Sequence, residues 1–124
     1  MTTGLVTVAL LFALHVGETD LAKHPRHGDG GRAHGPYQGH VEVIEDVNRI
    51  YGTNWTIKDF DDPASAAIIC TEYLDYWGGV YWQKTGKRPT NMVLARIWNG
   101  GPRGYRKSKT LKYWNDRIKP NLAG

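Results

Sequence analysis

Hydrophobic positions dominate the start of the chain, where residues 5–14 form an almost unbroken apolar run. The run is too short to span a bilayer. It has no Lys or Arg before it and no clean small-residue cleavage site after it, which disfavours a secretory signal peptide. A helix that is apolar on every side is typical of a domain interior. We therefore predict a buried first helix and no stable membrane insertion.

Two more helices follow from the spacing of apolar residues and from capping signals. A helix is expected from Val41, with its apolar residues on one face and Gly52 as its C-terminal cap. Asp62-Pro63 supplies an N-cap acid and a proline at the first helical position of the next one. The apolar stripe of that helix is Ile69, Cys70, Tyr73, Leu74 and Trp77. Gly78-Gly79 is expected to interrupt or end it.

The last third of the chain predicts two further helices. Thr90 can cap a helix that carries Val93, Leu94, Ile97 and Trp98 and stops at Gly100-Gly101-Pro102. Ser108 or Thr110 can start the final helix, on which Leu111, Trp114 and Ile118 are expected to face inward. Because no repeat, heptad pattern or second domain is evident, residues 1–124 are expected to form one domain.

Residues 23–39 break the helical pattern. Their glycines and prolines forbid a long helix and permit tight turns. Polar loops of this length inside a compact domain are commonly functional. We therefore expect a small helical domain with one Gly-rich loop or short β excursion near its beginning.

Composition and charge narrow the function classes. Hydrophobic residues make up 40% and charged residues 23% of the 124 residues, as in a globular domain. The formal charge of +4 and the pI of about 9.3 favour polyanionic partners, such as nucleic acid, acidic lipid or a carboxylate-rich cell wall. The single cysteine, Cys70, excludes an intrachain disulfide, and its apolar neighbours predict a buried structural thiol.

Glu18 is the first candidate for chemistry. It directly follows the apolar helix, so its carboxyl is expected at the edge of the core. An apolar wall disfavours the charged form and raises the pKa, as a general acid near neutral pH requires. The alternative is an ordinary solvated acid at a helix end.

Four short motifs occur in a characteristic order: Glu18-Thr19, the loop Gly28-Asp-Gly-Gly-Arg-Ala-His-Gly-Pro-Tyr-Gln38, Ala95-Arg-Ile-Trp-Asn-Gly-Gly-Pro102 and Thr110-Leu-Lys-Tyr-Trp114. Together they resemble the lysozyme-like superfamily, especially invertebrate-type lysozymes and the soluble lytic transglycosylase catalytic domain. In that family a helix ends in Glu-Ser, a turn reads Gly-x-x-Gln, and a later helix reads Tyr-Asn-x-Gly-Pro or His-Asn-Gly-Gly-Pro. The resemblance spans residues 9 to 118 and implies a mainly α (α+β lysozyme-like) fold.

The resemblance also implies roles for individual residues. Glu18 matches the acid that protonates the glycosidic oxygen. Tyr37 and Gln38 match the turn that lines the sugar cleft. Trp98 and Asn99 match an aromatic–Asn pair on the cleft wall, and Tyr113 matches a tyrosine near the acid. Buried packing is the alternative for Trp98 and Tyr113.

The second catalytic group is left open by the sequence. A retaining glycosidase needs a second carboxylate about 5–5.5 Å from the acid, and an inverting one needs it at roughly 6.5–9.5 Å. Asp29 is the favoured candidate, although Asp before Gly-Gly is also an ordinary turn residue. Asp20 is the weaker candidate. If neither acts, the 6-hydroxyl of the substrate can attack, which is the lytic transglycosylase route.

Two glycines depart from the family pattern. Gly17 stands where a larger helical residue is usual, so the helix is expected to fray one residue early. Gly39 replaces an aliphatic residue after Gln38 and is expected to loosen the turn. A catalytically inactive glycan-binding relative is therefore kept as an alternative.

Other residues suggest two alternative functions, metal binding and nucleic-acid binding. All five histidines lie between residues 15 and 40, and His24-x-x-His27 could form part of a zinc site, but no H-E-x-x-H or paired-Cys spacing accompanies it. A basic and aromatic segment from Arg103 to Tyr113 could bind nucleic acid, but no nucleic-acid-binding signature is present.

The resemblance therefore implies a lysozyme-type glycoside hydrolase that cuts the MurNAc-GlcNAc backbone of peptidoglycan. The expected partner is peptidoglycan or a chitin-like oligosaccharide, without nucleic acid, cofactor or metal. We expect a monomer that is secreted or delivered to the cell wall, extracellular or periplasmic, although no leader is evident.

Overall fold

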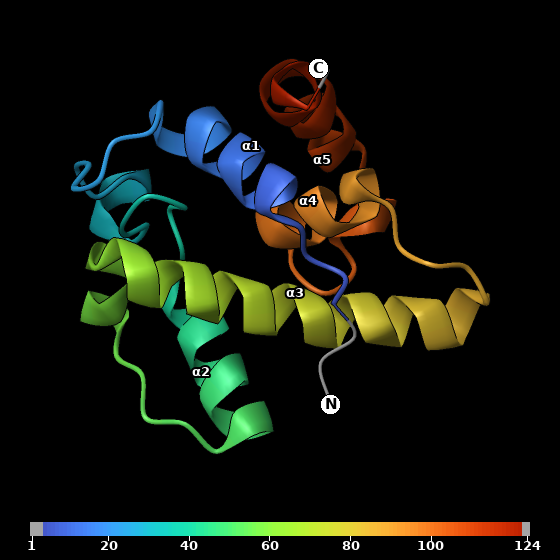
Figure 1. Ribbon diagram of the computed structural model, residues 1–124, viewed down its shortest axis with the longest axis horizontal. Coiled ribbons are helices and arrows are strands. Elements are labelled where there is room, and N and C mark those ends of the chain that lie inside the picture. The colour runs from blue at the N-terminus through green and yellow to red at the C-terminus, as the bar shows by residue number, and fades with distance from the viewer. Residues whose placement is uncertain (1–3, 123–124) are drawn as a thin grey trace.

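A computed structural model describes residues 4–122, which fold into five α-helices (Figure 1). The helices are α1 Val8–Thr19, α2 Val41–Tyr51, α3 Pro63–Thr85, α4 Asn91–Gly100 and α5 Ser108–Tyr113. Short 3₁₀ turns are η1 Asp29–Gly31, η2 Ile57–Asp61, η3 Gly104–Arg106 and η5 Lys119–Asn121, and η4 Trp114–Ile118 is a π-helical turn. The prediction of a mainly α domain is confirmed.

Helix α3 runs across the whole molecule, with α1, α4 and α5 on one side and α2 on the other (Figure 1). It begins as predicted, because the Asp62 carboxylate accepts a hydrogen bond from the Ser65 N–H at 3.0 Å. The predicted break at Gly78-Gly79 is wrong, since the helix continues to Thr85. Gly78 packs closely against Leu94, and this tertiary packing outweighs the helix-propensity cost of glycine, about 1 kcal/mol.

Helix α1 is buried on one face only. Leu10, Ala13 and Leu14 are buried, whereas Val8 is 84% and Phe12 is 51% exposed. The first helix is therefore buried along one stripe of its surface, and not on every side as predicted. The Thr7 hydroxyl caps the helix start by accepting from the Leu10 N–H at 3.0 Å.

The ends of α2 and α4 follow the predicted signals, whereas one side chain predicted to face inward from the last helix does not. Gly52 caps α2 in the left-handed region, and the Thr90 hydroxyl caps α4 by accepting from the Val93 N–H at 3.3 Å. Trp114 is buried as expected, but Leu111 is 40% exposed, so its predicted inward position is wrong. It lies off the buried face of α5, which Thr110 and Tyr113 form.

None of the helices within residues 4–122 is both long enough and apolar enough to cross a membrane.

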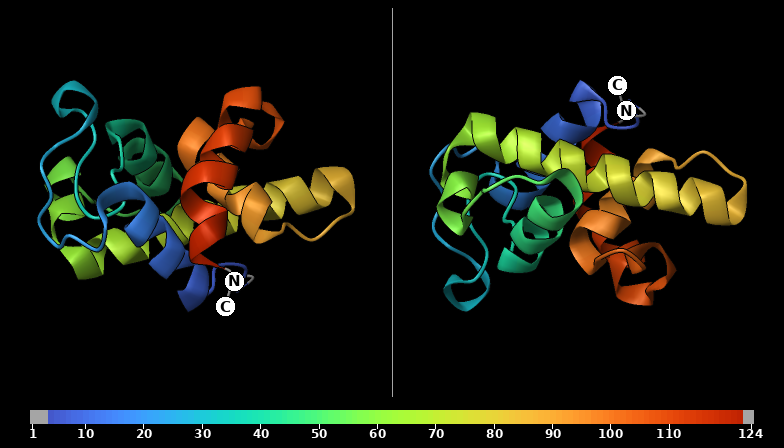
Figure 2. Two further views of the ribbon diagram at one scale, coloured as in Figure 1. Left: turned by 90° about the horizontal axis from the view of Figure 1, so that it is seen from above. Right: turned by 90° about the horizontal axis from the view of Figure 1, so that it is seen from below.

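The core lies between α3 and the helices on both sides of it. Cys70 is fully buried there, as predicted, beside Ile69 and Leu74. The C-terminal helical segment, from α5 through η4 and η5, lies beside α1 (Figure 2). A residue at the end of α1 can therefore meet one that is almost a hundred positions later in the chain.

Both glycines that depart from the lysozyme-like pattern lie in tight contacts. A Cβ on Gly17 would lie 2.5 Å from Ile118 Cδ1 and 2.6 Å from the Arg117 carbonyl oxygen. A Cβ on Gly39 would collide with the Phe60 ring. Helix α1 extends to Thr19, so the expected early fraying at Gly17 is wrong. These glycines permit close packing.

Replacing Gly17 by Ala is expected to destabilise the protein by about 1–3 kcal/mol, because the new methyl group meets backbone and core atoms that cannot move aside freely. The matched control is Gly79→Ala, since a Cβ there has no neighbour within 4 Å. This control is expected to be neutral or to stabilise α3 by about 0.5–1 kcal/mol. Urea unfolding of both variants measures the difference, and equal effects would contradict the packing role of Gly17.

Candidate active site

Five of the seven residues that the sequence singled out line one cleft of about 500 Å³. These residues are Glu18, Asp29, Gln38, Trp98 and Asn99. Ala33, His40, Lys109 and Arg117 complete the wall. The fold thus brings the end of α1, the Gly-rich loop, the end of α4 and the C-terminal segment together around one open space.

Glu18 is on the last turn of α1, at the edge of the core. Burial raises the pKa of its carboxyl above the ordinary glutamate value. The Tyr113 hydroxyl donates to Glu18 Oε2 at 2.7 Å, and this bond and the nearby Arg117 charge oppose the rise without cancelling it. The Glu18 carboxyl therefore holds its proton to a higher pH than an ordinary glutamate does, and the Tyr113 hydroxyl and the Arg117 charge stabilise the carboxylate once it forms.

The loop is fastened to the helix end that carries Glu18. The Thr19 hydroxyl donates to the Pro36 carbonyl at 2.9 Å. His15 Nε2 is 2.7 Å from the Ala22 carbonyl, which ties down the chain immediately after α1. Since only an N–H can donate to a carbonyl, this contact places the ring proton on Nε2. These two contacts, from Thr19 and from His15, together fix the position of Glu18 relative to the loop.

Arg117 was not singled out in the sequence. Its Nε and Nη2 donate to the Gly17 carbonyl at 3.0 and 2.7 Å, and its guanidinium carbon is 5.8 Å from the centre of the Tyr113 ring. It belongs to the π-helical turn η4, a kind of irregularity that often occurs at functional sites. No local pattern pointed to Arg117, because the carbonyl that it hydrogen-bonds, that of Gly17, is 100 residues away.

Asp29 is an exposed carboxylate on the loop side of the same cleft. Its Oδ1 is 3.4 Å from Arg32 Nη2, and its Oδ2 is 3.4 Å from His40 Nε2. Its backbone has φ +51°, a left-handed conformation that few non-glycine residues adopt. Asp20, the weaker candidate from the sequence, is exposed beyond the end of α1 and is not among the residues that line the cleft.

Gln38 lines the cleft, but its amide is largely occupied by the loop itself. Oε1 accepts from the Gly28 N–H at 3.0 Å, and Nε2 donates to the carbonyls of Gly35 and Arg26 at 2.9 and 3.3 Å. Both amide protons are thus used within the protein. Gln38 therefore holds the loop in shape, and one free lone pair on Oε1 is left for a ligand.

Trp98 and Asn99 form the cleft wall at the end of α4. Trp98 is only 8% exposed, because Phe60 and Tyr73 pack against its ring edge to face, and its Nε1 donates to the Tyr37 carbonyl at 2.9 Å. Asn99 is exposed. The two residues also line an adjoining hollow of about 190 Å³, so the groove continues past Trp98.

Tyr37 does not occupy the place that the resemblance implied. Its side chain is 7% exposed within the hydrophobic core, and burial raises the pKa of its hydroxyl to about 12. It is not among the residues that line the cleft. The Tyr37 side chain therefore lies in the core and not on the wall of this cleft, and the Tyr37 carbonyl accepts the hydrogen bond that positions Trp98.

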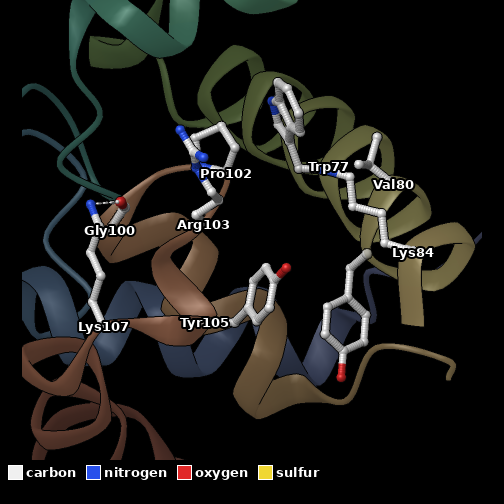
Figure 3. Close-up of a pocket in the computed structure, with 9 residues that line it drawn as sticks. Trp77, Val80, Lys84, Gly100, Pro102, Arg103, Tyr105 and Lys107 are labelled. Carbon is white, nitrogen blue, oxygen red and sulfur yellow. Dashed lines mark hydrogen bonds between the residues drawn. The ribbon is translucent and has the colours of Figure 1, made fainter. Parts of the chain in front are cut away.

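A separate pocket of about 490 Å³ lies between α3 and the segment that follows α4 (Figure 3). Trp77, Val80, Tyr81 and Lys84 line it from α3, and Gly100, Pro102, Arg103, Tyr105 and Lys107 line it from the other side. Its lining holds aromatic rings and basic groups without a carboxylate. Part of the basic and aromatic segment that suggested nucleic-acid binding therefore lines this pocket.

The chain matches no model of a known protein family and no curated protein. The chemistry of the cleft is therefore the main guide to function.

Replacing Tyr113 by Phe is expected to raise the pKa of Glu18 further, because the variant loses the hydrogen bond that favours the charged carboxylate. Carbon-13 NMR titration of the Glu18 carboxyl group measures the shift. Tyr105→Phe in the separate pocket is the matched control and should leave this pKa unchanged. An unchanged or lowered pKa in Tyr113→Phe would contradict the role of the hydroxyl.

Proposed function

We propose that this protein is a lysozyme-like glycosidase that cleaves peptidoglycan between N-acetylmuramic acid and N-acetylglucosamine, with Glu18 as the general acid. One observation carries the proposal. A partly buried carboxyl with a raised pKa opens into a polar cleft and is hydrogen-bonded to a tyrosine from the far end of the chain. A general acid at near-neutral pH needs a raised pKa and access to the substrate, and the tyrosine hydroxyl can stabilise the carboxylate that forms after proton transfer.

The proposed reaction begins when Glu18 donates its proton to the glycosidic oxygen. The bond between that oxygen and the anomeric carbon breaks, and positive charge develops on the sugar ring. Glu18 is left as a carboxylate, which the Tyr113 hydroxyl and the Arg117 charge stabilise. The same carboxylate can then take a proton from the incoming nucleophile.

Asp29 is the proposed second carboxylate. Its exposed side chain lines the same cleft, so it can stabilise the developing positive charge, attack it or activate a water molecule. The alternative is a lytic transglycosylase. In that route the 6-hydroxyl of the muramic acid attacks its own anomeric carbon, gives its proton to Glu18 and forms a 1,6-anhydro product without a second carboxylate.

Several features fit a glycan substrate of this class. The groove that continues past Trp98 suits an extended polymer, and Asn99 presents an exposed amide to sugar hydroxyls. Lys109 and Arg117 line the cleft, and the +4 formal charge favours an anionic wall. The isolated bridges Gly28–Ala33 and His34–Gly39 are in keeping with the short β excursion of a lysozyme-like α+β fold. We further propose that the protein acts outside the cytoplasmic membrane, as a monomer.

The second candidate function is glycan binding without catalysis. The glycines at 17 and 39 suggest it, but Gly17 packs closely within an intact α1 and Gly39 packs against the Phe60 ring. Nucleic-acid binding is a third candidate, because the separate pocket combines Trp77 and Tyr105 with Lys84, Arg103 and Lys107. Salt-dependent binding of oligonucleotides that is lost in Arg103→Ala would favour it over wall cleavage.

Glu18→Gln is expected to fold normally and to lose about 10²–10⁴-fold in activity, since its amide cannot donate the catalytic proton. Digests of purified peptidoglycan by the wild type and the variant, read by mass spectrometry of the muropeptides, test this. Ordinary reducing ends would identify a hydrolase, and 1,6-anhydro ends would identify a lytic transglycosylase. Substantial lysis by Glu18→Gln would refute the assignment.

Asp29→Asn is expected to reduce hydrolysis by about 10²-fold or more, because the neutral amide removes the second carboxylate from the cleft. Asp20→Asn is the matched control and should retain activity, since Asp20 does not line the cleft. Initial rates on labelled peptidoglycan measure both. A mild effect of Asp29→Asn would exclude Asp29 as the second catalytic group and favour attack by the 6-hydroxyl.

A further inference from the structure

Two of the five histidines converge with a carboxylate outside the Glu18 cleft. His27 Nε2 is 3.3 Å from Asp61 Oδ1, and His34 Nδ1 is 3.3 Å from Asp61 Oδ2. One ligand atom from each of the three residues can be chosen so that all lie within 4.8 Å of one another. His24, whose spacing from His27 suggested a zinc site in the sequence, is not in this group.

The distances within this cluster suit two ligands on one metal ion. Zinc binds imidazole nitrogen at about 2.0–2.1 Å and carboxylate oxygen at about 2.0–2.2 Å, so tetrahedral geometry separates them by roughly 3.4 Å. Each histidine nitrogen lies 3.3 Å from a different oxygen of the Asp61 carboxylate, which is close to that value. They are long for direct N–H···O hydrogen bonds, which are usually about 2.7–3.2 Å.

The backbone around the cluster is held in place by glycine contacts. Gly35 has φ +78°, and a Cβ there would collide with the Phe60 carbonyl group. Gly39 lies against the Phe60 ring in the same way. These contacts hold the loop against η2 and bring His34, which is 14% exposed, beside Asp61. Two ligands therefore lie on segments that the fold already fixes against each other.

His27 completes the cluster from the outer part of the loop. Its ring stacks on the His34 ring, with 3.6 Å between the centroids and 25° between the planes. Because an imidazole nitrogen binds a metal in the plane of its ring, His27 must rotate out of this stack to share an ion with His34, and its side chain, 45% exposed, has room to do so. The exposure of His27 and Asp61 also leaves a side through which an ion and a water ligand can enter.

We propose that His27, His34 and Asp61 bind one divalent transition-metal ion of the zinc class, which fastens the Gly-rich loop to η2. Two imidazoles and one carboxylate favour such an ion over Ca²⁺ or Mg²⁺, which prefer oxygen ligands. Three protein ligands leave the fourth position of a tetrahedral site to water. Because these residues do not line the Glu18 cleft, the proposed role is to hold the loop that carries Asp29 and Gln38.

The test uses the full chain without a histidine tag, with ZnCl₂ as the probe. Equilibrium dialysis with metal analysis gives the stoichiometry, and calorimetric titration gives the affinity. One zinc ion per chain is expected, together with a rise in the melting temperature of about 5–10 °C when zinc is in large excess over Kd. MgCl₂ at the same concentration should give neither effect.

His27→Ala is the informative variant, because this exposed residue can be removed with little effect on folding. It should weaken zinc binding by more than about tenfold and remove the thermal stabilisation. Asp61→Asn should do the same, and His24→Ala on the same loop is the matched control that should bind zinc as the wild type does. Failure of the wild type to bind zinc stoichiometrically, equal binding by His27→Ala, or an equal loss in His24→Ala would each overturn the proposal. None of these outcomes depends on glycosidase activity.

Discussion

The candidate active site depends on the close approach of α1 to the C-terminal segment at Gly17. Because Gly17 has no side chain, the Arg117 carbonyl and the Ile118 side chain can lie directly against the helix. The Arg117 guanidinium then reaches the Gly17 carbonyl, and the Tyr113 hydroxyl reaches Glu18. A larger residue at position 17 would collide with these atoms, so we expect the two segments to move apart and the contact between Tyr113 and Glu18 to weaken.

The opposite wall of the cleft is built on a second close contact, between the Gly-rich loop and Phe60. Gly35 and Gly39 bring the loop backbone onto η2, and the Gln38 amide ties the loop across to Gly28. The loop has two isolated bridges and little regular structure, so these contacts supply the rigidity that a sheet would otherwise give. Asp29 is thereby held beside the cleft, and the proposed metal would strengthen the same attachment.

The electrostatics of Glu18 link stability to the proposed chemistry. Burial raises the pKa of Glu18 above its value in an unfolded chain, so the native state holds the proton more tightly. This contribution to stability is fully present below the unfolded-state pKa and is lost as the pH rises through the folded-state pKa. At neutral pH the site therefore costs stability, as expected where a carboxyl is kept ready to donate a proton. Tyr113 and Arg117 limit that cost and would stabilise the carboxylate that remains after proton transfer.

The sequence alone determined where the helices form, that Cys70 is buried and that Glu18 is a candidate acid. The signals for these features are helix caps, the spacing of apolar residues and a carboxyl directly after an apolar run, and each of them acts within a few residues. The tertiary structure decided what depends on distant partners. In the folded protein α3 continues through Gly78-Gly79, Leu111 is exposed and Tyr37 is buried in the core. The tertiary structure also formed the hydrogen bond from Tyr113 to Glu18 across 95 positions, where only the resemblance had placed a tyrosine near the acid, and it brought His27, His34 and Asp61 together. Such contacts arise from the fit between packed surfaces, which the spacing of residues along one segment does not encode.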